Sequence, residues 1–246
     1  MIIKRLKYIV LYIFVSFLCT QNIFAGPPFN TDDPEPVPLK SWELYFSTIN
    51  NYQSHIATGN APLFEANYGI IKNMHIGISL PTNYTITNSN SIFEFSTIGL
   101  GAKYRFIEES DYIPQIAIYP SIEIPVFKTT ELKDEKASIF IPLWFQKTWD
   151  KFSTYGGAGY TINNTKGLRN TMYFGWEAQY EFSEKLMIGG EVYHETADVS
   201  GDKSTTGFNI GGTTKLSSKS NFIFSFGPDF SDKQSYNAYL GIQLSI

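Results

Sequence analysis

Hydrophobic and polar residues alternate along most of the chain from about residue 40 onward. The clearest segment is the last one, where one set of alternate positions reads Tyr236, Ala238, Leu240, Ile242, Leu244 and Ile246. The positions between them are Asn237, Tyr239, Gly241, Gln243 and Ser245. A period of two residues is typical of a β-strand with two different faces and not of a helix. The pattern therefore predicts an all-β protein.

About twelve segments share this alternation. They are 40–52, 62–71, 74–84, 94–107, 113–126, 137–149, 152–162, 170–182, 186–196, 204–216, 221–228 and 235–246. An even number of antiparallel strands in up-and-down order is typical of a bacterial outer-membrane β-barrel. We therefore predict a transmembrane antiparallel barrel of about 12 strands, with ten or fourteen as the alternatives.

The predicted connections alternate between long and short, as barrels of this class require. Long ones fall at 54–61, 86–91, 128–136, 163–169 and 197–203, and short ones at 72–73, 150–151, 183–185 and 216–220. With both ends of the barrel chain in the periplasm, every long connection lies outside the cell.

A water-soluble β-sandwich is the main alternative, because its strands also alternate. The polarity of the second face separates the two folds. In this chain that face carries glycine, tyrosine, glutamine and charges of both signs, which is typical of a confined lumen. The candidates for lining and selectivity of the lumen are Glu43, Glu65, Lys103, Arg105, Glu123, Gln146, Glu177, Gln179, Glu191 and Glu195.

The opposite face is predicted to meet lipid. It carries Ile76, Ile78, Ile116, Ile118, Phe174, Phe208, Ile210, Leu240 and Ile242. Tyrosine and tryptophan gather where hydrocarbon meets headgroups. The residues near strand ends that fit such girdles are Trp42, Tyr45, Tyr68, Tyr84, Tyr104, Trp149, Tyr160, Tyr180 and Tyr193. For Tyr68, Tyr104 and Tyr193 the alternation is ambiguous, and a position facing the lumen is the alternative.

The first 25 residues have the pattern of a secretory signal peptide. Lys4, Arg5 and Lys7 precede an apolar run from Tyr8 to Leu18, and a small residue, Ala25, ends the segment. An 11-residue apolar run is too short for a spanning helix, which needs about 20. We expect a signal helix at 1–25 that is cleaved off, a proline-rich periplasmic leader at 26–39, and an outer-membrane barrel at 40–246.

Composition excludes several classes of protein. The only cysteine, Cys19, lies in the signal segment, so the mature chain has neither a disulfide nor a thiolate metal site. The net charge of -4 and the absence of a basic stripe argue against nucleic-acid binding. The acidic motif Asp32-Asp33-Pro34-Glu35 offers oxygen ligands for a cation. We favour a structural role for it, in the lumen or at the periplasmic rim, and expect neither metal nor cofactor.

Catalysis has weak support in the residues. An acyl hydrolase of this class needs a histidine beside a serine near the outer leaflet. Of the three histidines only His194 is suitably placed, with Ser204 across the next hairpin. One such proximity among many serines does not indicate an enzyme, so a lipid acyl hydrolase or transferase is the least favoured of the functions considered.

Motifs spread over the chain resemble one family of outer-membrane proteins. They are Gly26-Pro27-Pro28-Phe29-Asn30-Thr31-Asp32-Asp33-Pro34-Glu35-Pro36-Val37, Trp42-Glu43, Phe64-Glu65-Ala66-Asn67-Tyr68-Gly69, Gly101-Ala102-Lys103-Tyr104-Arg105-Phe106, Pro142-Leu143-Trp144-Phe145-Gln146-Lys147, Tyr155-Gly156-Gly157-Ala158-Gly159-Tyr160, Gly189-Gly190-Glu191 and Thr206-Gly207-Phe208-Asn209-Ile210-Gly211-Gly212. The chain is similar to the transporter-like barrels labelled as a MetA pathway of phenol degradation. The resemblance implies a barrel that passes small molecules, aromatic or otherwise hydrophobic ones among them.

We therefore expect an outer-membrane channel with a narrow, charged lumen, surrounded by lipid and lipopolysaccharide and inserted by the barrel-assembly machinery. A structural or adhesive barrel with a blocked lumen is the alternative. Within the lumen we expect Lys103 and Arg105 to form a basic pole against the carboxylates of Glu123, Glu177 and Glu191, because confined charges need partners.

Overall fold

The computed structural model describes residues 28–95, 97–126, 136–231 and 234–246, and in these parts it contains fourteen antiparallel β-strands. They are β1 (Trp42–Gln53), β2 (Ile56–Ile71), β3 (Met74–Ile86), β4 (Ser91–Glu94), β5 (Thr97–Ile107), β6 (Gln115–Ile118), β7 (Ser121–Pro125), β8 (Ser138–Trp149), β9 (Phe152–Asn163), β10 (Thr171–Ser183), β11 (Leu186–Glu195), β12 (Thr205–Lys215), β13 (Ser220–Phe230) and β14 (Gln234–Ser245).

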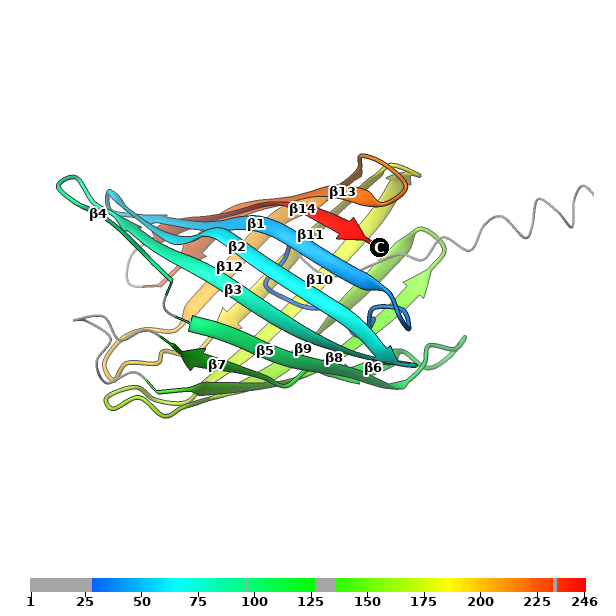
Figure 1. Ribbon diagram of the computed structural model, residues 1–246, viewed down its shortest axis with the longest axis horizontal. Helices are drawn as coiled ribbons and strands as arrows, with labels where there is room; N and C mark the ends of the chain where they lie inside the picture. The colour runs from blue at the N-terminus through cyan, green and yellow to red at the C-terminus, as the bar shows by residue number, and fades with distance from the viewer. Residues whose placement is uncertain (1–27, 96, 127–135, 232–233) are drawn as a thin grey trace, which may run out of the picture.

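These strands close into a barrel with twelve strand positions around the ring, as predicted (Figure 1). We call each position a stave, and two of the staves consist of two strands in line. The first and last strands pair directly, with Leu44 opposite Leu244, and this pairing closes the ring. β4 and β5 both pair with β3 and continue one another along a single stave. β6 and β7 likewise share a stave between β5 and β8. Closure pairs the backbone of the long strands on both sides, which is what a bilayer requires of strands, and the short β4 pairs on one side only, with β3.

The break between β6 and β7 falls at Tyr119 and Pro120. Proline has no N–H to donate to a ladder, so it interrupts regular pairing. The stave stays in place because Ala102 N–H donates to the Pro120 carbonyl oxygen at 3.0 Å. Tyr119 consequently remains on the inner side of the wall, where its ring lies near Lys103.

The first of the predicted long connections differs from its prediction. The segment 54–61, expected to be a long loop, is a turn at Ser54 and His55 flanked by paired strand residues. Both turn residues have positive φ, 51° and 69°, as tight two-residue hairpins require. β1 and β2 therefore extend further than the alternation of apolar residues indicated. The predicted connection at 128–136 lies almost wholly outside the described residues.

Alternation of burial along the strands separates an inner from an outer face. In β10 every second side chain from Thr171 to Gln179 is buried, while Met172, Phe174 and Trp176 are exposed. The nine residues predicted to face lipid all lie on the outer face. The girdle prediction is wrong for Tyr45 and Tyr84, which are buried, and Tyr193 takes the alternative position, facing the lumen. Their positions near strand ends did not reveal on which face they lie.

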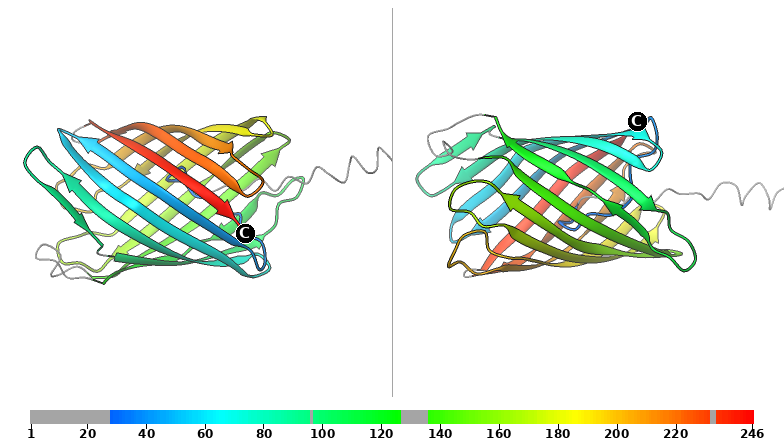
Figure 2. Two further views of the ribbon diagram at one scale, coloured as in Figure 1. Left: turned by 45° about the horizontal axis from the view of Figure 1, so that its top comes forward. Right: turned by 90° about the horizontal axis from the view of Figure 1, so that it is seen from below.

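The two open ends of the barrel differ. We call the end that carries Ile246 and the turns at 72–73, 150–151, 184–185 and 216–219 the short-turn mouth, and the other end the long-loop mouth. The strands run obliquely between the two mouths (Figure 2). The predicted signal segment, 1–25, lies outside the described residues. Across the described ranges no helix is long and apolar enough to cross a membrane.

Candidate functional site

A segment without regular secondary structure runs inside the barrel ahead of β1. We call its described part, residues 28–39, the leader. It enters at the short-turn mouth, where the Lys40 N–H donates to the Gly69 carbonyl oxygen at 2.7 Å. The leader is the dark blue segment seen between the strands in Figure 2, and its residues Thr31, Asp33 and Pro34 are fully buried. Its prolines remove N–H groups, so it docks through hydrogen bonds and ion pairs with side chains of the wall and not as an added strand.

On one wall the leader is held by two cations of β5. Lys103 Nζ lies 3.0 Å from Asp32 Oδ1 and 3.8 Å from Asp33 Oδ1, and it donates to the Asp33 carbonyl oxygen at 2.7 Å. Arg105 forms an ion pair with Glu35. Both cations belong to the predicted set, and the leader supplies the carboxylates that pair with them.

Arg105 is also bound to the wall. Its Nη1 donates to Gln115 Oε1 at 2.9 Å and its Nη2 to Asn73 Oδ1 at 3.0 Å. Next to it on β3, His75 Nδ1 accepts the Val37 N–H at 3.0 Å. The guanidinium is thereby fixed in one orientation, and the leader meets a rigid basic surface.

The opposite wall holds the leader by its backbone. The Glu191 carboxylate of β11 accepts the N–H groups of Asn30 and Thr31, at 2.9 and 2.8 Å. It also accepts a bond from Asn209 Nδ2 at 2.7 Å. Ser225 of β13 donates to the Pro28 carbonyl oxygen at 2.6 Å. Because β11 lies across the ring from β5, the leader spans the lumen from wall to wall.

Glycine makes part of this approach possible. A Cβ built on Gly175 would lie 2.1 Å from Thr31 Oγ1, far inside van der Waals contact. Thr31 Oγ1 is also 3.1 Å from the Tyr173 hydroxyl. The bare backbone at residue 175 therefore lets the leader lie directly against β10.

The predicted pairing of Lys103 and Arg105 with Glu123, Glu177 and Glu191 is wrong. Their ion-pair partners within 4.0 Å are leader residues. Glu191 binds backbone N–H groups instead, and no hydrogen-bond partner is seen for either carboxylate oxygen of Glu177 among the described residues. The two-residue alternation along each strand correctly predicted that these side chains lie on the inner face. It could not show that a segment outside the sheet would come between them.

All ten predicted lumen residues lie on the inner face. Glu177, Glu191, Gln146 and Gln179 are buried around the leader, while Glu43 accepts a hydrogen bond from Gln243. Glu65 is paired in register with Tyr45. Glu123 and Glu195 are more exposed and line a cavity of about 380 Å³ toward the long-loop mouth, together with Asn30 and Tyr173. Their role in selectivity stays a prediction.

A larger cavity, of about 450 Å³, lies on the same side of the leader. Phe29, Tyr173, Tyr193 and Tyr239 give it aromatic walls. Its polar end is a triad in which Tyr193 and Asn237 donate to the Asp229 carboxylate. The sequence pattern did not single out these residues as site residues, although Tyr173 and Tyr193 share the parity of Glu177 and Glu191.

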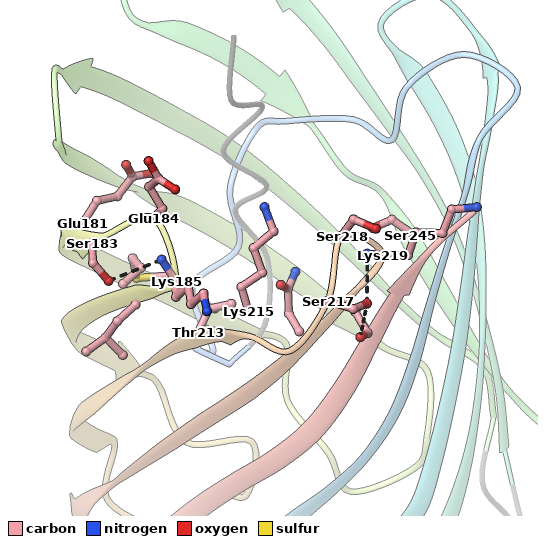
Figure 3. Close-up of a pocket in the computed structure, with 14 residues that line it drawn as sticks. Glu181, Ser183, Glu184, Lys185, Thr213, Lys215, Ser217, Ser218, Lys219 and Ser245 are labelled. Carbon is pink, nitrogen blue, oxygen red and sulfur yellow. Dashed lines mark hydrogen bonds between the residues drawn. The ribbon is translucent and has the colours of Figure 1, made fainter. Parts of the chain in front are cut away.

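The short-turn mouth has a smaller cavity, of about 180 Å³, between two turns (Figure 3). Lys185 comes from the β10–β11 turn, and Lys215 and Lys219 lie at the β12–β13 turn. Glu181 and Glu184 line the same cavity. This cavity therefore mixes both signs of charge, and Leu186 and Met187 add an apolar part to its lining.

Two carboxylates of the leader have raised pKa values. Burial raises the pKa of Asp33 well above its usual range, and the nearby charge of Lys103 opposes the rise. Burial also raises the pKa of Glu35, against the pull of Arg105. The docked leader therefore binds protons more readily than a leader in water does.

A closed antiparallel barrel of twelve staves with a polar, charged lumen is the architecture of outer-membrane channels and porins. The chain belongs to the family described as "Putative MetA-pathway of phenol degradation", which matches residues 50–246. The sequence resemblance is thereby confirmed. A search of curated proteins returned no match.

Several solved structures share the fold. The COG4313 outer membrane channel from Pseudomonas putida F1 superposes with a TM-score of 0.67 at 10% identity, covering 89% of this chain and 100% of that one. The NanC porin gives 0.58 at 7% identity, over 82% and 98% of the two chains. The KdgM porin gives 0.55 at 10% identity, over 82% and 99%. At such identities the likeness establishes the fold alone.

Proposed function

We propose that the protein is an outer-membrane channel that passes small solutes through a narrow, charged lumen, which the leader closes at rest. The observation that carries this proposal is the way the leader is held. It spans the lumen on side-chain contacts and joins the sheet by a single bridge in the described residues, Leu39 to Gly69. A segment held in this way can leave without breaking the barrel.

The larger cavity beside the leader, with its aromatic walls, indicates which class of solute the channel passes. Its aromatic walls favour an apolar, ring-containing body, and the triad of Tyr193, Asp229 and Asn237 offers hydrogen bonds to a polar substituent. This agrees with the small aromatic or otherwise hydrophobic molecules that the family resemblance implies. Inward carboxylates outnumber Lys103 and Arg105, which favours neutral solutes and cations over inorganic anions.

The orientation follows from the barrel class. With the short-turn mouth in the periplasm and the long-loop mouth outside, the leader lies on the periplasmic side and the aromatic cavity opens outward. Cleavage after Ala25 and insertion by the barrel-assembly machinery belong to this proposal.

Conductance across a planar bilayer tests the channel against a structural or adhesive barrel. The purified protein should give small, discrete current steps, and a variant lacking residues 28–38 should give larger ones. If neither protein conducts, although both show the heat-modifiable gel mobility of a folded barrel, the lumen is blocked and the structural alternative holds.

The enzyme alternative makes a separate prediction. His194 has its Nδ1 2.8 Å from Thr206 Oγ1, and its strand neighbours Tyr193 and Glu195, not His194, line the lumenal cavity. His194→Ala should leave single-channel conductance and selectivity unchanged. A loss of phospholipid hydrolysis or acyl transfer in this variant, relative to a measurable wild-type rate, would revive the catalytic alternative.

A further inference from the structure

In the described residues the barrel strands give Lys103 and Arg105 no ion-pair partner within 4.0 Å, and the wall carboxylates Glu43 and Glu108 act on them only at longer range. In the barrel register His75 lies opposite Lys103 on one side, and Ala117 lies opposite Arg105 on the other. The polar neighbours that bind Arg105 are Asn73 and Gln115. Within the described chain, each ion pair of the two cations is made with the leader. The carboxylates of β1 and β2, Glu43 and Glu65, belong to staves beyond β3.

Departure of the leader would therefore leave both cations without an ion-pair partner. With the leader docked, the Lys103 side chain is only 4% exposed and that of Arg105 only 17%. When the leader leaves, water solvates the two charges in part, but they lose the carboxylates that balance them in a confined lumen, and this loss has a cost. An anion that takes the place of the leader carboxylates removes this cost, so leader release and anion arrival are coupled.

We propose that Lys103 and Arg105 form a binding site for the carboxylate of a small organic acid, and that Asp32, Asp33 and Glu35 occupy this site as a tethered competitor in the resting channel. The proposal rests on the proposed function, because it assumes that solutes enter this lumen. The leader then acts as a plug that its own solute displaces.

The surroundings of the two cations favour an acid with an apolar ring. Lys103 Nζ lies 5.0 Å from the centre of the Tyr119 ring. Tyr119 in turn packs against the buried aromatic cluster of Trp144, Tyr173 and Tyr193. The excess of carboxylates elsewhere in the lumen repels multiply charged and inorganic anions. A monocarboxylate with an aromatic body offsets that repulsion by contact with these rings.

Titration calorimetry on the folded protein in detergent tests the site with benzoate as probe and benzamide as its neutral control. Benzoate should bind, and benzamide should bind roughly tenfold or more weakly, because a hydrogen bond to a charged group is worth about 1.5–3 kcal/mol. Lys103→Met and Arg105→Met should each weaken benzoate binding about tenfold or more. Lys147→Ala, which removes an ion pair with Glu109 away from the leader, should leave it unchanged.

Competition with the leader gives the decisive comparison. In an Asp32→Asn, Asp33→Asn, Glu35→Gln variant, which leaves the barrel strands intact, benzoate affinity should rise about tenfold or more. Unchanged benzoate affinity in this variant, or equal binding of benzoate and benzamide by the wild type, would overturn the proposal. Calorimetry in detergent needs no conduction. If benzoate binds but the protein conducts no current, the channel proposal fails and the carboxylate site stands. If the protein conducts but benzoate does not bind, the carboxylate site fails and the channel proposal stands.

Discussion

Replacing Arg105 by alanine should raise the single-channel conductance and shift the selectivity further toward cations. Arg105 joins Glu35 of the leader to Gln115 and Asn73 of the wall, so its loss detaches one end of the plug. A charged hydrogen bond of this kind contributes about 2 kcal/mol. That corresponds to a shift of roughly thirtyfold in the ratio of docked to released leader. Reversal potentials in a salt gradient measure the change in selectivity.

Lys147→Ala is the matched control for this prediction. Its ion pair with Glu109 has side-chain exposures of 16% and 23%, close to the 17% and 30% of Arg105 and Glu35. Lys147 lies near the short-turn mouth, where its ammonium group binds Glu109 and the Ser110 carbonyl oxygen and not the leader. Its removal should change neither conductance nor reversal potential. If Arg105→Ala behaves like this control in a correctly folded barrel, the leader does not gate the lumen.

Glu35→Gln separates release of the leader from the electrostatic field of the lumen. This change also breaks the ion pair with Arg105, so conductance should rise as it does in Arg105→Ala. It removes a negative charge instead of a positive one, so cation selectivity should fall. Equal selectivity shifts in the two variants would mean that the charges act only through the position of the leader.

The barrel itself was predictable because alternation is a local property. Each strand shows the alternation by itself, as β10 does from Thr171 to Gln179. Because every strand has lipid on one side and the lumen on the other, the same alternation is required around the whole barrel. Errors arose where the pattern does not carry the information. The turn at Ser54 and His55 was hidden because the ends of β1 and β2 lack the alternation of apolar and polar residues.

The site was predictable only in part. Parity placed Lys103, Arg105 and Glu191 on the inner face, and that face is where they lie. The partners of these residues could not be predicted, because the leader lacks a regular alternation of apolar and polar residues. Its position in the lumen therefore cannot be derived from its sequence. Its acidic residues were visible in the sequence, and the two inward cations that lie two residues apart on β5 were the signal that could have pointed to them.

Arginine at Ile210 should destabilise the folded barrel by about 2–4 kcal/mol, the cost of a basic side chain near the bilayer midplane. Ile210 lies midway along β12, is 57% exposed on the outer face, and pairs in register with Gly190 and Phe226. Thr214→Arg is the matched control, because Thr214 has the same outward parity near the short-turn end of the strand, where the cost falls to about 0–1 kcal/mol. Denaturant titration in lipid vesicles, followed by heat-modifiable gel mobility, measures both. Equal costs at the two positions would mean that β12 does not cross the bilayer with Ile210 near the midplane.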